Sequence, residues 1–304
     1  MAVLTANKER AFSAGATAVP VGAYLRKNAA WILLAAAGWV ALFWPTLCGL
    51  FQYWLEDPDY SHGFLIPVIS AAILLRSRGR LSLVEVKGSA KGLFALLASL
   101  VLLALGALSY TNILERLAAW FALVSAIWFL LGSESVWRQR FPLVFLLLSI
   151  PPPFFLLGSF RLALKGIATR LSADILSILG YQAFAEGSVL SLGEHQLEVA
   201  DACSGIRSMM AIIATAILFA HVFRCGVGKG TLLTLTAVPV TLVVNVLRIL
   251  LISVALVSFD LDLTHGVRHE VVGFGVFGLS LAFLYGALRF YDWLFQWRAK
   301  DGGS

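Results

Sequence analysis

The sequence predicts an all-α polytopic membrane protein with about eight transmembrane helices, an outer amphipathic helix and a short β-hairpin before the sixth span. Hydrophobic residues make up 60% of the 304 residues and charged residues 13%, whereas a soluble domain carries roughly 25% charged residues. The mean hydropathy of +0.87 is too high for the alternating strands of an outer-membrane barrel. Apolar runs also reach ~20 residues, the length that crosses a bilayer. Together these observations exclude an ordinary soluble enzyme and a disordered chain.

The apolar runs divide the chain into a membrane domain with two tails. We expect a disordered cytoplasmic tail over residues 1–28, a single transmembrane domain over 29–293 and a cytoplasmic tail over 294–304. The Pro151-Pro152-Pro153 triplet lacks three N–H donors and should break the fifth span near its end. The eight expected spans are about 29–51, 61–76, 91–110, 114–132, 141–157, 204–223, 231–257 and 270–292.

The distribution of lysine and arginine predicts the orientation of these spans. With the N-terminus in the cytoplasm, 16 of the 23 basic residues fall on the inner side and 7 on the outer side. Cytoplasmic loops carry the excess of basic residues, so both termini are expected inside. The basic residues flank apolar runs instead of forming one patch, so the net charge of +6 does not indicate nucleic-acid binding.

The long outer segment before the sixth span has two expected parts. An apolar stripe at helical spacing predicts an amphipathic helix on the membrane surface. Alternating residues over 188–192 and 196–201, around Gly193-Glu194-His195, predict the β-hairpin. The stripe consists of Leu164, Ile167, Leu171, Ile175 and Ile178.

Cys203 lies where this hairpin meets the sixth span. A cysteine at a helix N-terminus faces unpaired N–H groups and the positive end of the dipole, which favour the nucleophilic thiolate. The same N–H groups can stabilise an oxyanion. The alternative is an ordinary small buried residue, the interpretation that we give to Cys48 and Cys225.

Arg248 is an ionisable residue within the apolar seventh span, near its outer end. Such a residue is costly in a membrane and marks a functional site by default, although an arginine that reaches lipid phosphate is an equal alternative. Asn245 is three residues earlier and therefore on the same helix face.

His269 opens the eighth span on the outer side. A helix N-terminus disfavours imidazolium, so this histidine is expected to stay neutral and able to accept a proton. The order of His265, His269 and Glu270 is not that of a zincin, so we expect no metal and no cofactor. His62 and His195 are also outer residues and compete for the role of base.

Four sequence blocks resemble the exosortases in order and spacing, and archaeosortases share the arrangement of Cys, Arg and His. The similarity extends from about residue 29 to 293. The blocks are Asp59-Tyr60-Ser61-His62-Gly63, Ala202-Cys203-Ser204-Gly205-Ile206-Arg207, Asn245-Val246-Leu247-Arg248-Ile249, and His269-Glu270-Val271-Val272-Gly273 with Val276-Phe277.

This resemblance implies a cysteine protease and transpeptidase of the bacterial inner membrane with its active site on the periplasmic face. It implies that exported proteins with a C-terminal PEP-CTERM sorting signal are the substrates and that Cys203, Arg248 and His269 are the catalytic residues. Water or an amine at the cell surface would resolve the acyl-thioester. The sorting signal carries a glutamate, and the basic residues Arg161, Lys165, Arg170 and Arg207 are candidates to bind it, with binding to membrane lipid as the equal alternative. Asn245 and His62 are further candidates to bind the substrate.

Two other function classes compete with this interpretation. A transporter or channel would use Arg248 to bind an anion, but charges deep in the spans are nearly absent. A non-catalytic scaffold accounts for the composition but not for the aligned Cys, Arg and His.

The catalytic interpretation makes a geometric prediction. If Cys203, Arg248 and His269 form one site, the last three spans must touch near their outer ends, with the Cys203 sulfur within roughly 3–6 Å of a nitrogen of Arg248 or His269. We also expect Asn245, a backbone carbonyl or an outer acid such as Asp57 or Asp59 beside Arg248.

Overall fold

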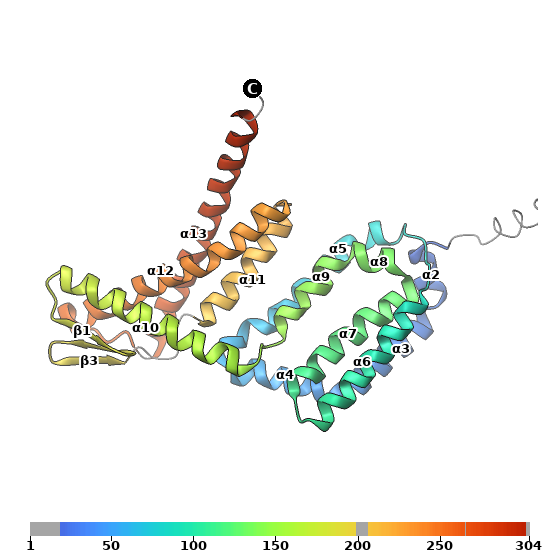
Figure 1. Cartoon of the computed structure of the whole chain (residues 1–304), viewed down its shortest axis with the longest axis horizontal. Coiled ribbons are helices and arrows are strands. Elements are labelled where there is room, and N and C mark those ends of the chain that lie inside the picture. The colour runs from blue at the N-terminus through green and yellow to red at the C-terminus, as the bar shows by residue number, and fades with distance from the viewer. Residues whose placement is uncertain (1–18, 199–205, 265, 302–304) are drawn as a thin grey trace, which may run out of the picture. The chain divides into compact units, whose positions relative to one another are not determined.

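A computed structural model describes residues 19–198, 206–264 and 266–301 of the protein (Figure 1). Cys203 therefore lies outside the described residues. The chain divides into two compact units, which are described separately. Unit 1 comprises Met1–Glu56 and Gly63–Pro151, and unit 2 comprises Asp57–His62 and Pro152–Ser304.

Unit 1 is made of helices. The α6–α7 hairpin is packed beside α4, and α5 is packed against α9 and η2. In order, its described elements are α2 (Val21–Lys27), α3 (Ala29–Leu42), α4 (Trp44–Glu56), α5 (Leu65–Leu81), α6 (Ala90–Leu108), α7 (Asn112–Leu131), α8 (Ser133–Arg138), α9 (Arg140–Phe145) and the 3₁₀ helix η2 (Leu146–Ser149).

The first expected span is bent instead of straight. Helices α3 and α4 meet at Phe43 with an angle of 65°. Pro45, at the second position of α4, has no N–H to donate, and its ring would clash with the carbonyl four residues earlier in a continuous helix. The helix therefore ends at Leu42 and restarts at Trp44.

The last residues of the expected disordered tail are ordered. Val21 is fully buried, and its N–H donates to the carbonyl of Val84 at 2.7 Å. The N–H of Val86 donates to Val19 at 2.9 Å. These backbone hydrogen bonds hold α2 against the segment that follows α5. They join residues more than sixty positions apart, so no local pattern in the sequence indicates them.

Small residues let α6 and α7 approach closely. A Cβ at Gly92 would lie 2.4 Å from the backbone nitrogen of Phe129, and one at Gly106 would lie 2.9 Å from that of Glu115. Lipid chains are as apolar as leucine, so membrane helices associate through such close packing and not through the hydrophobic effect. The buried small residues of this pair are Gly92, Ser99 and Gly106 on α6, and Ala118, Ala119, Ala122 and Ser125 on α7.

A tight turn connects α7 to α8. Gly132 has a φ of +91°, and a Cβ there would lie 2.2 Å from the carbonyl oxygen of Lys87. The turn therefore requires a glycine.

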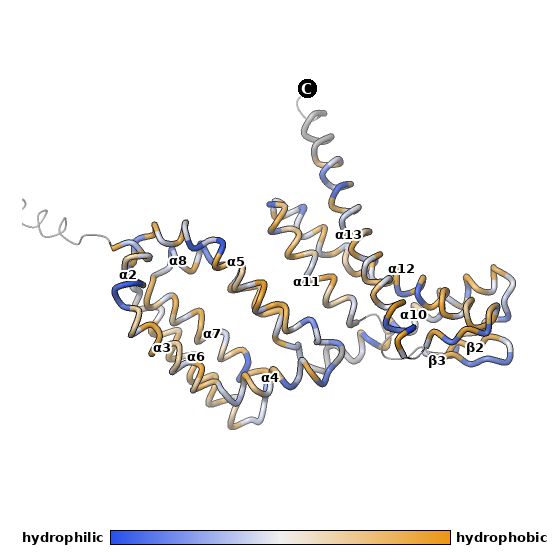
Figure 2. The backbone as a smooth tube through the Cα atoms, turned by 180° about the vertical axis from the view of Figure 1, so that it is seen from behind, coloured by the Kyte–Doolittle hydropathy of each residue, from blue (hydrophilic) through white to orange (hydrophobic). Residues whose placement is uncertain are grey.

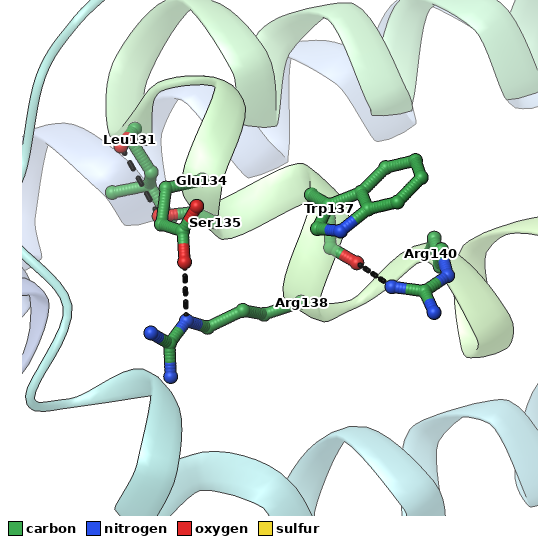
Figure 3. Close-up of polar contacts among 6 residues, drawn as sticks. All are labelled: Leu131, Glu134, Ser135, Trp137, Arg138 and Arg140. Atoms are coloured by element: carbon green, nitrogen blue, oxygen red, sulfur yellow. Dashed lines mark hydrogen bonds and ion pairs between the residues drawn. The ribbon is translucent and has the colours of Figure 1, made fainter.

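Polar side chains follow this turn. Arg138 donates to Glu134 at 2.7 Å, and Arg140 donates to the carbonyl of Trp137 at 3.2 Å (Figure 3). Hydrophilic residues gather around α2 and α8, as the blue segments of Figure 2 show. This end of unit 1 is opposite to the α6–α7 turn (Figure 1).

The fifth expected span ends early. Its helical residues run from Arg140 to Ser149, and Ile150 has an extended backbone. The helix that follows starts only at Phe154, after the proline triplet. The break therefore lies at the proline triplet, as the sequence predicts. The helical residues end at Ser149, eight residues before the expected end of the span at 157, after Leu146–Ser149 has tightened into a 3₁₀ turn.

Unit 2 combines four long helices with a small sheet. Its elements are most of the 3₁₀ helix η1 (Pro58–Phe64), then α10 (Phe154–Ile178), β1 (Ala183–Glu186), β2 (Val189–Leu192), β3 (His195–Glu198), α11 (Ile206–Val222), α12 (Val227–Phe259) and α13 (Gly266–Asp301).

The sheet is antiparallel in the order β1-β2-β3. The expected hairpin corresponds to β2 and β3, with Leu192 opposite His195, whereas β1 is an additional strand. Both connections have two residues and start with a glycine of positive φ, Gly187 at +62° and Gly193 at +60°, as tight hairpin turns require.

The sheet, α10 and α12 share one hydrophobic core, which includes leucines of β2 and β3. The buried members of this core are Ala168, Ala173, Leu176, Ala183, Leu190, Leu192, Leu197, Val246, Ile249 and Ile252.

Helix α10 buries only the start of the expected apolar stripe. Leu164 is 9% exposed and packs with Met209, whereas Ile167, Leu171, Ile175 and Ile178 are exposed. The face that packs on the sheet and α12 instead carries Ala168 and Leu176, which are fully buried. The exposed part of the stripe stays available to a membrane surface.

A second core joins α11, α12 and α13. Its buried residues are Ile212, Ala216, Leu233, Ala237, Leu284 and Leu288. Helix α13 continues to Asp301, so the residues from 294 to 301, expected as a tail, extend the last helix.

The described residues contain five helices that are long and apolar enough to cross a membrane, or six with the bent pair α3–α4. About eight were expected. The helices Arg140–Ser149 and Ser208–Val222 are apolar but shorter than a span. The architecture is that of an all-α polytopic membrane protein with one small sheet.

Candidate active site

Helix α12 places two polar side chains in the interior of unit 2. Asn245 is 5% exposed and Arg248 is 9% exposed. Ile249 and Ile252, on the following turn, belong to the core with α10 and the sheet. That packing fixes the rotation of α12 about its axis and directs the face with Asn245 and Arg248 inward.

The guanidinium of Arg248 meets the imidazole of His269. Arg248 Nη2 lies 2.7 Å from His269 Nε2. His269 is in the first turn of α13, three residues after Gly266, whose φ is +66°. The chain reverses between α12 and α13, and this turn brings the ends of the two helices together.

The hydrogen-bond partners assign the tautomer of His269. Nδ1 lies 3.2 Å from the carbonyl oxygen of Leu263, which can only accept a hydrogen bond. Nδ1 therefore carries the proton and donates, while Nε2 accepts from the Arg248 guanidinium, which is a donor only. The imidazole in this arrangement is neutral.

The loop between the helices supports this orientation. Asp262 Oδ1 accepts a hydrogen bond from the N–H of Thr264 at 2.7 Å, and Asp260 adopts the left-handed conformation that caps α12. Such short-range bonds hold the carbonyl of Leu263 in place.

Gly273 is the next residue of α13 that faces Arg248. A Cβ at this position would lie 3.6 Å from Arg248 Nη2, an ordinary van der Waals distance. Gly273 follows His269 by one helical turn, so the guanidinium lies along this face of α13.

An ion pair that sequence reasoning missed lies elsewhere in unit 2. Asp59 of η1 pairs with Arg161 of α10. Asp59 is buried, and the Arg161 side chain is 24% exposed. Asp59 was one of the acids expected beside Arg248, and Arg161 was a candidate to bind substrate; the structure pairs these two residues with each other. Their separation of 102 residues explains why no local pattern indicated the pair.

The remaining predicted residues differ in accessibility. Lys165 is buried at 7%, while Arg170 and His195 are exposed. Both ring nitrogens of His62 are buried and have no hydrogen-bond partner among the described residues. Arg207 belongs to the first turn of α11. Cys203 falls between β3 and α11, outside the described residues.

One family matches most of this chain. The family described as transmembrane exosortase matches residues 54–286, which is 233 of the 304 residues and includes Arg248 and His269. No curated protein matches the chain. No solved structure matches it either.

Proposed function

Because this chain belongs to the transmembrane exosortase family, we propose that it is an integral-membrane cysteine protease and transpeptidase. Its substrates are exported proteins with a C-terminal PEP-CTERM-type sorting signal, and Cys203 forms the acyl-thioester. The contact of 2.7 Å between Arg248 and His269 is the observation that carries this proposal. A buried arginine and a partly buried histidine from separate helices meet there, at positions that resemble the family's signature blocks.

The first chemical step forms the thioester. Cys203 loses its thiol proton to a base, and the sulfur attacks the peptide carbonyl carbon of the substrate. The carbonyl π electrons move to the oxygen, and the oxyanion then collapses and breaks the C–N bond. The leaving nitrogen takes the proton that the base had received, and the C-terminal helix of the substrate departs.

The second step releases the product. Water, or an amine at the cell surface, attacks the thioester carbonyl, and the carbon–sulfur bond breaks. The nucleophile gives up a proton and the thiolate takes one, so the enzyme returns to its starting state.

His269 and Arg248 have different capacities in these steps. His269 has one protonated and one unprotonated ring nitrogen, so it can accept and return a proton. A guanidinium is a hydrogen-bond donor only and does not act as a base in proteins, so we assign Arg248 the role of stabilising the thiolate and the oxyanion. Asn245 lies one turn away on α12 and is 5% exposed; we assign it a contact with substrate inside the site.

Recognition of the glutamate in the sorting signal is assigned to basic residues of α10 and α11. Arg170 is exposed, and Arg207 is four residues after Cys203 in the sequence. A substrate carboxylate would compete with Asp59 for Arg161, and Lys165 is buried. We therefore rank Arg170 and Arg207 ahead of Arg161, Lys165 and His62.

Co-expression with a PEP-CTERM substrate tests the function. Processing to the shortened product is expected with the natural chain and absent with Cys203→Ser, because a serine hydroxyl is a much weaker nucleophile. Cys225→Ser is the matched control, since Cys225 lies between α11 and α12 in the second core of unit 2. Normal processing by Cys203→Ser would refute the enzyme assignment and leave the anion transporter as the alternative.

The proposed orientation places both termini in the cytoplasm of a bacterial inner membrane and the active site on the periplasmic face. A thiol reagent that cannot cross membranes should label Cys203 from outside in spheroplasts. It should reach Cys225 only after the membrane is opened. Labelling of Cys225 alone in intact spheroplasts would invert the orientation.

A further inference from the structure

Unit 1 contains a polar cavity that the proposed catalytic chemistry does not use. Its volume is about 280 Å³, close to the lower end of the range of ~300–1,000 Å³ for small-molecule sites. One face of α4 and the first turn of α7 form its walls, and these two helices pack against each other. The lining residues are Pro45, Thr46, Gly49, Gln52, Tyr53, Glu56, Asn112, Glu115 and Arg116.

The cavity contains both signs of charge. Glu56 and Glu115 supply two carboxylates, and Arg116 supplies one guanidinium. The carbon at the centre of that guanidinium lies 5.0 Å from the centre of the Tyr53 ring, which holds it by a cation–π contact. Thr46, which is buried, donates to Glu115 Oε2 at 3.4 Å. Neighbouring side chains therefore hold the Glu115 carboxylate and the Arg116 guanidinium in the cavity, and Glu56 adds a second carboxylate to its lining.

Gly49 contributes the open space of the cavity. A Cβ at this position would have no atom within 4 Å. Gly49 therefore does not serve close helix packing, unlike Gly92 and Gly106 of α6. Its missing side chain leaves room in the wall of the cavity instead.

The depth of the cavity matches a lipid headgroup. Asn112 is the first residue of a helix that is long and apolar enough to cross a membrane, and Glu56 is the last residue of α4. Charged side chains at the end of a span lie at the level of the headgroups, not among the acyl chains.

We propose that this cavity binds the zwitterionic group of an ethanolamine phosphate, with its ammonium at Glu56 and Glu115 and its phosphate at Arg116. A primary ammonium has three N–H donors for carboxylate oxygens. A quaternary ammonium has none and is usually held by a cage of several aromatic rings, of which this cavity has only Tyr53 among its lining residues. The two carboxylates therefore select the primary amine. The ligand is the headgroup of a phosphatidylethanolamine or the free phosphodiester headgroup.

Native mass spectrometry of the purified full chain, exchanged into mixed vesicles, tests the site. Equal amounts of phosphatidylethanolamine, phosphatidylcholine and phosphatidylglycerol are offered. We expect retention of the ethanolamine lipid above the other two, and a loss of about tenfold with Glu115→Gln, the order expected for a charge-assisted hydrogen bond. Arg116→Gln should weaken all three lipids, because each carries a phosphate.

The matched control is Glu134→Gln, which removes an exposed carboxylate from α8 at the opposite end of unit 1 (Figure 1). It should leave lipid retention unchanged. Gly49→Leu keeps every charge and fills the cavity, so it should also abolish the preference. Comparison of the thermal stability of all variants separates loss of the site from loss of the fold. Equal retention of the three lipids by the natural chain, or a preference that survives both Glu115→Gln and Gly49→Leu, would overturn the proposal.

Competition with soluble glycerophosphoethanolamine distinguishes the two sources of the ligand. Displacement of the bound lipid by the soluble compound shows that the headgroup alone is recognised, whereas the absence of displacement shows that the acyl chains are also required. His269→Ala should bind lipid like the natural chain. Lipid binding is therefore measured independently of the proposed peptide cleavage.

Discussion

Helices α12 and α6 are both long and apolar, but they bury very different shares of their surface. Half of the apolar window of α12 is buried inside its unit, against 17% of that of α6. Helix α6 buries glycine and serine against one partner, α7. Helix α12 packs against α10, α11 and α13 and buries Asn245 and Arg248 among them. A polar residue in a span needs such neighbours, since lipid offers it no hydrogen bonds. In the proposed mechanism, α12 therefore carries the polar residues of the active site, whereas α6 provides close packing.

Loss of His269 should have the largest effect on processing. His269→Ala removes the proton acceptor beside Arg248, and general acid–base catalysis typically contributes ~10²–10⁴-fold. The rate of product formation in detergent micelles is the measurement. His195→Ala, an exposed histidine on β3, is the control and should retain activity. An unchanged rate with His269→Ala would move the role of base to His62 or His195.

Replacement of Arg248 should have the next largest effect. Arg248→Lys keeps a charge but loses the fork of donors that reaches His269. We expect a fall of ~10²–10³ in kcat, the cost of one oxyanion-stabilising donor. Arg268→Lys, at an exposed position next to His269 in the sequence, controls for the substitution itself. Equal rates for both variants would contradict the role of Arg248.

The α6–α7 hairpin should respond in stability and not in chemistry. Gly92→Ala places a Cβ 2.4 Å from the backbone nitrogen of Phe129, and such overpacking costs about 1–3 kcal/mol. Gly38→Ala, in α3, has no atom within 4 Å of the added Cβ. It should be neutral or slightly stabilising, because alanine is the better helix former. Thermal unfolding of the two variants in the same detergent compares them directly, and equal midpoints would show that α6 and α7 tolerate a wider separation.

The smallest effect is expected at the surface of unit 1. Glu134 and Arg138 form an i,i+4 pair whose side chains are 57% and 51% exposed (Figure 3). Such pairs contribute roughly 0.3–0.5 kcal/mol. Glu134→Gln should therefore shift the unfolding midpoint by less than Gly92→Ala, and the shift should vanish in high salt. A salt-independent loss would show that Glu134 has a role in packing.

Local sequence patterns predicted the elements better than their contacts. Composition and basic residues indicated a polytopic membrane protein, and the order of spans placed Arg248 and His269 on sequential helices. Short connections between antiparallel neighbours made their contact an expected one. The strand β1 was missed because Ala183 and Ala185 alternate with Phe184 and Glu186 without a strong β preference.

Long-range contacts account for most of the differences. The pairing of Asp59 with Arg161 and the bonds that hold Val21 to Val84 join segments far apart in the chain. The apolar stripe of α10 shows the same limit, since it is buried only at Leu164, and Ala168 and not Ile167 faces the core with the sheet. Helical spacing defines a face, but only the surrounding elements decide which face is covered.

In the proposed mechanism, the hydrogen bonds of His269 have a consequence for the timing of catalysis. While Arg248 donates to Nε2, the only lone pair of the ring is occupied, and the proton on Nδ1 is committed to Leu263. The imidazole cannot take a proton from a thiol until the guanidinium turns away. A substrate carbonyl oxygen that draws off the Arg248 donor would therefore release the base at the moment when the electrophile arrives. Such an arrangement keeps the resting enzyme inert toward water and makes the substrate itself the trigger.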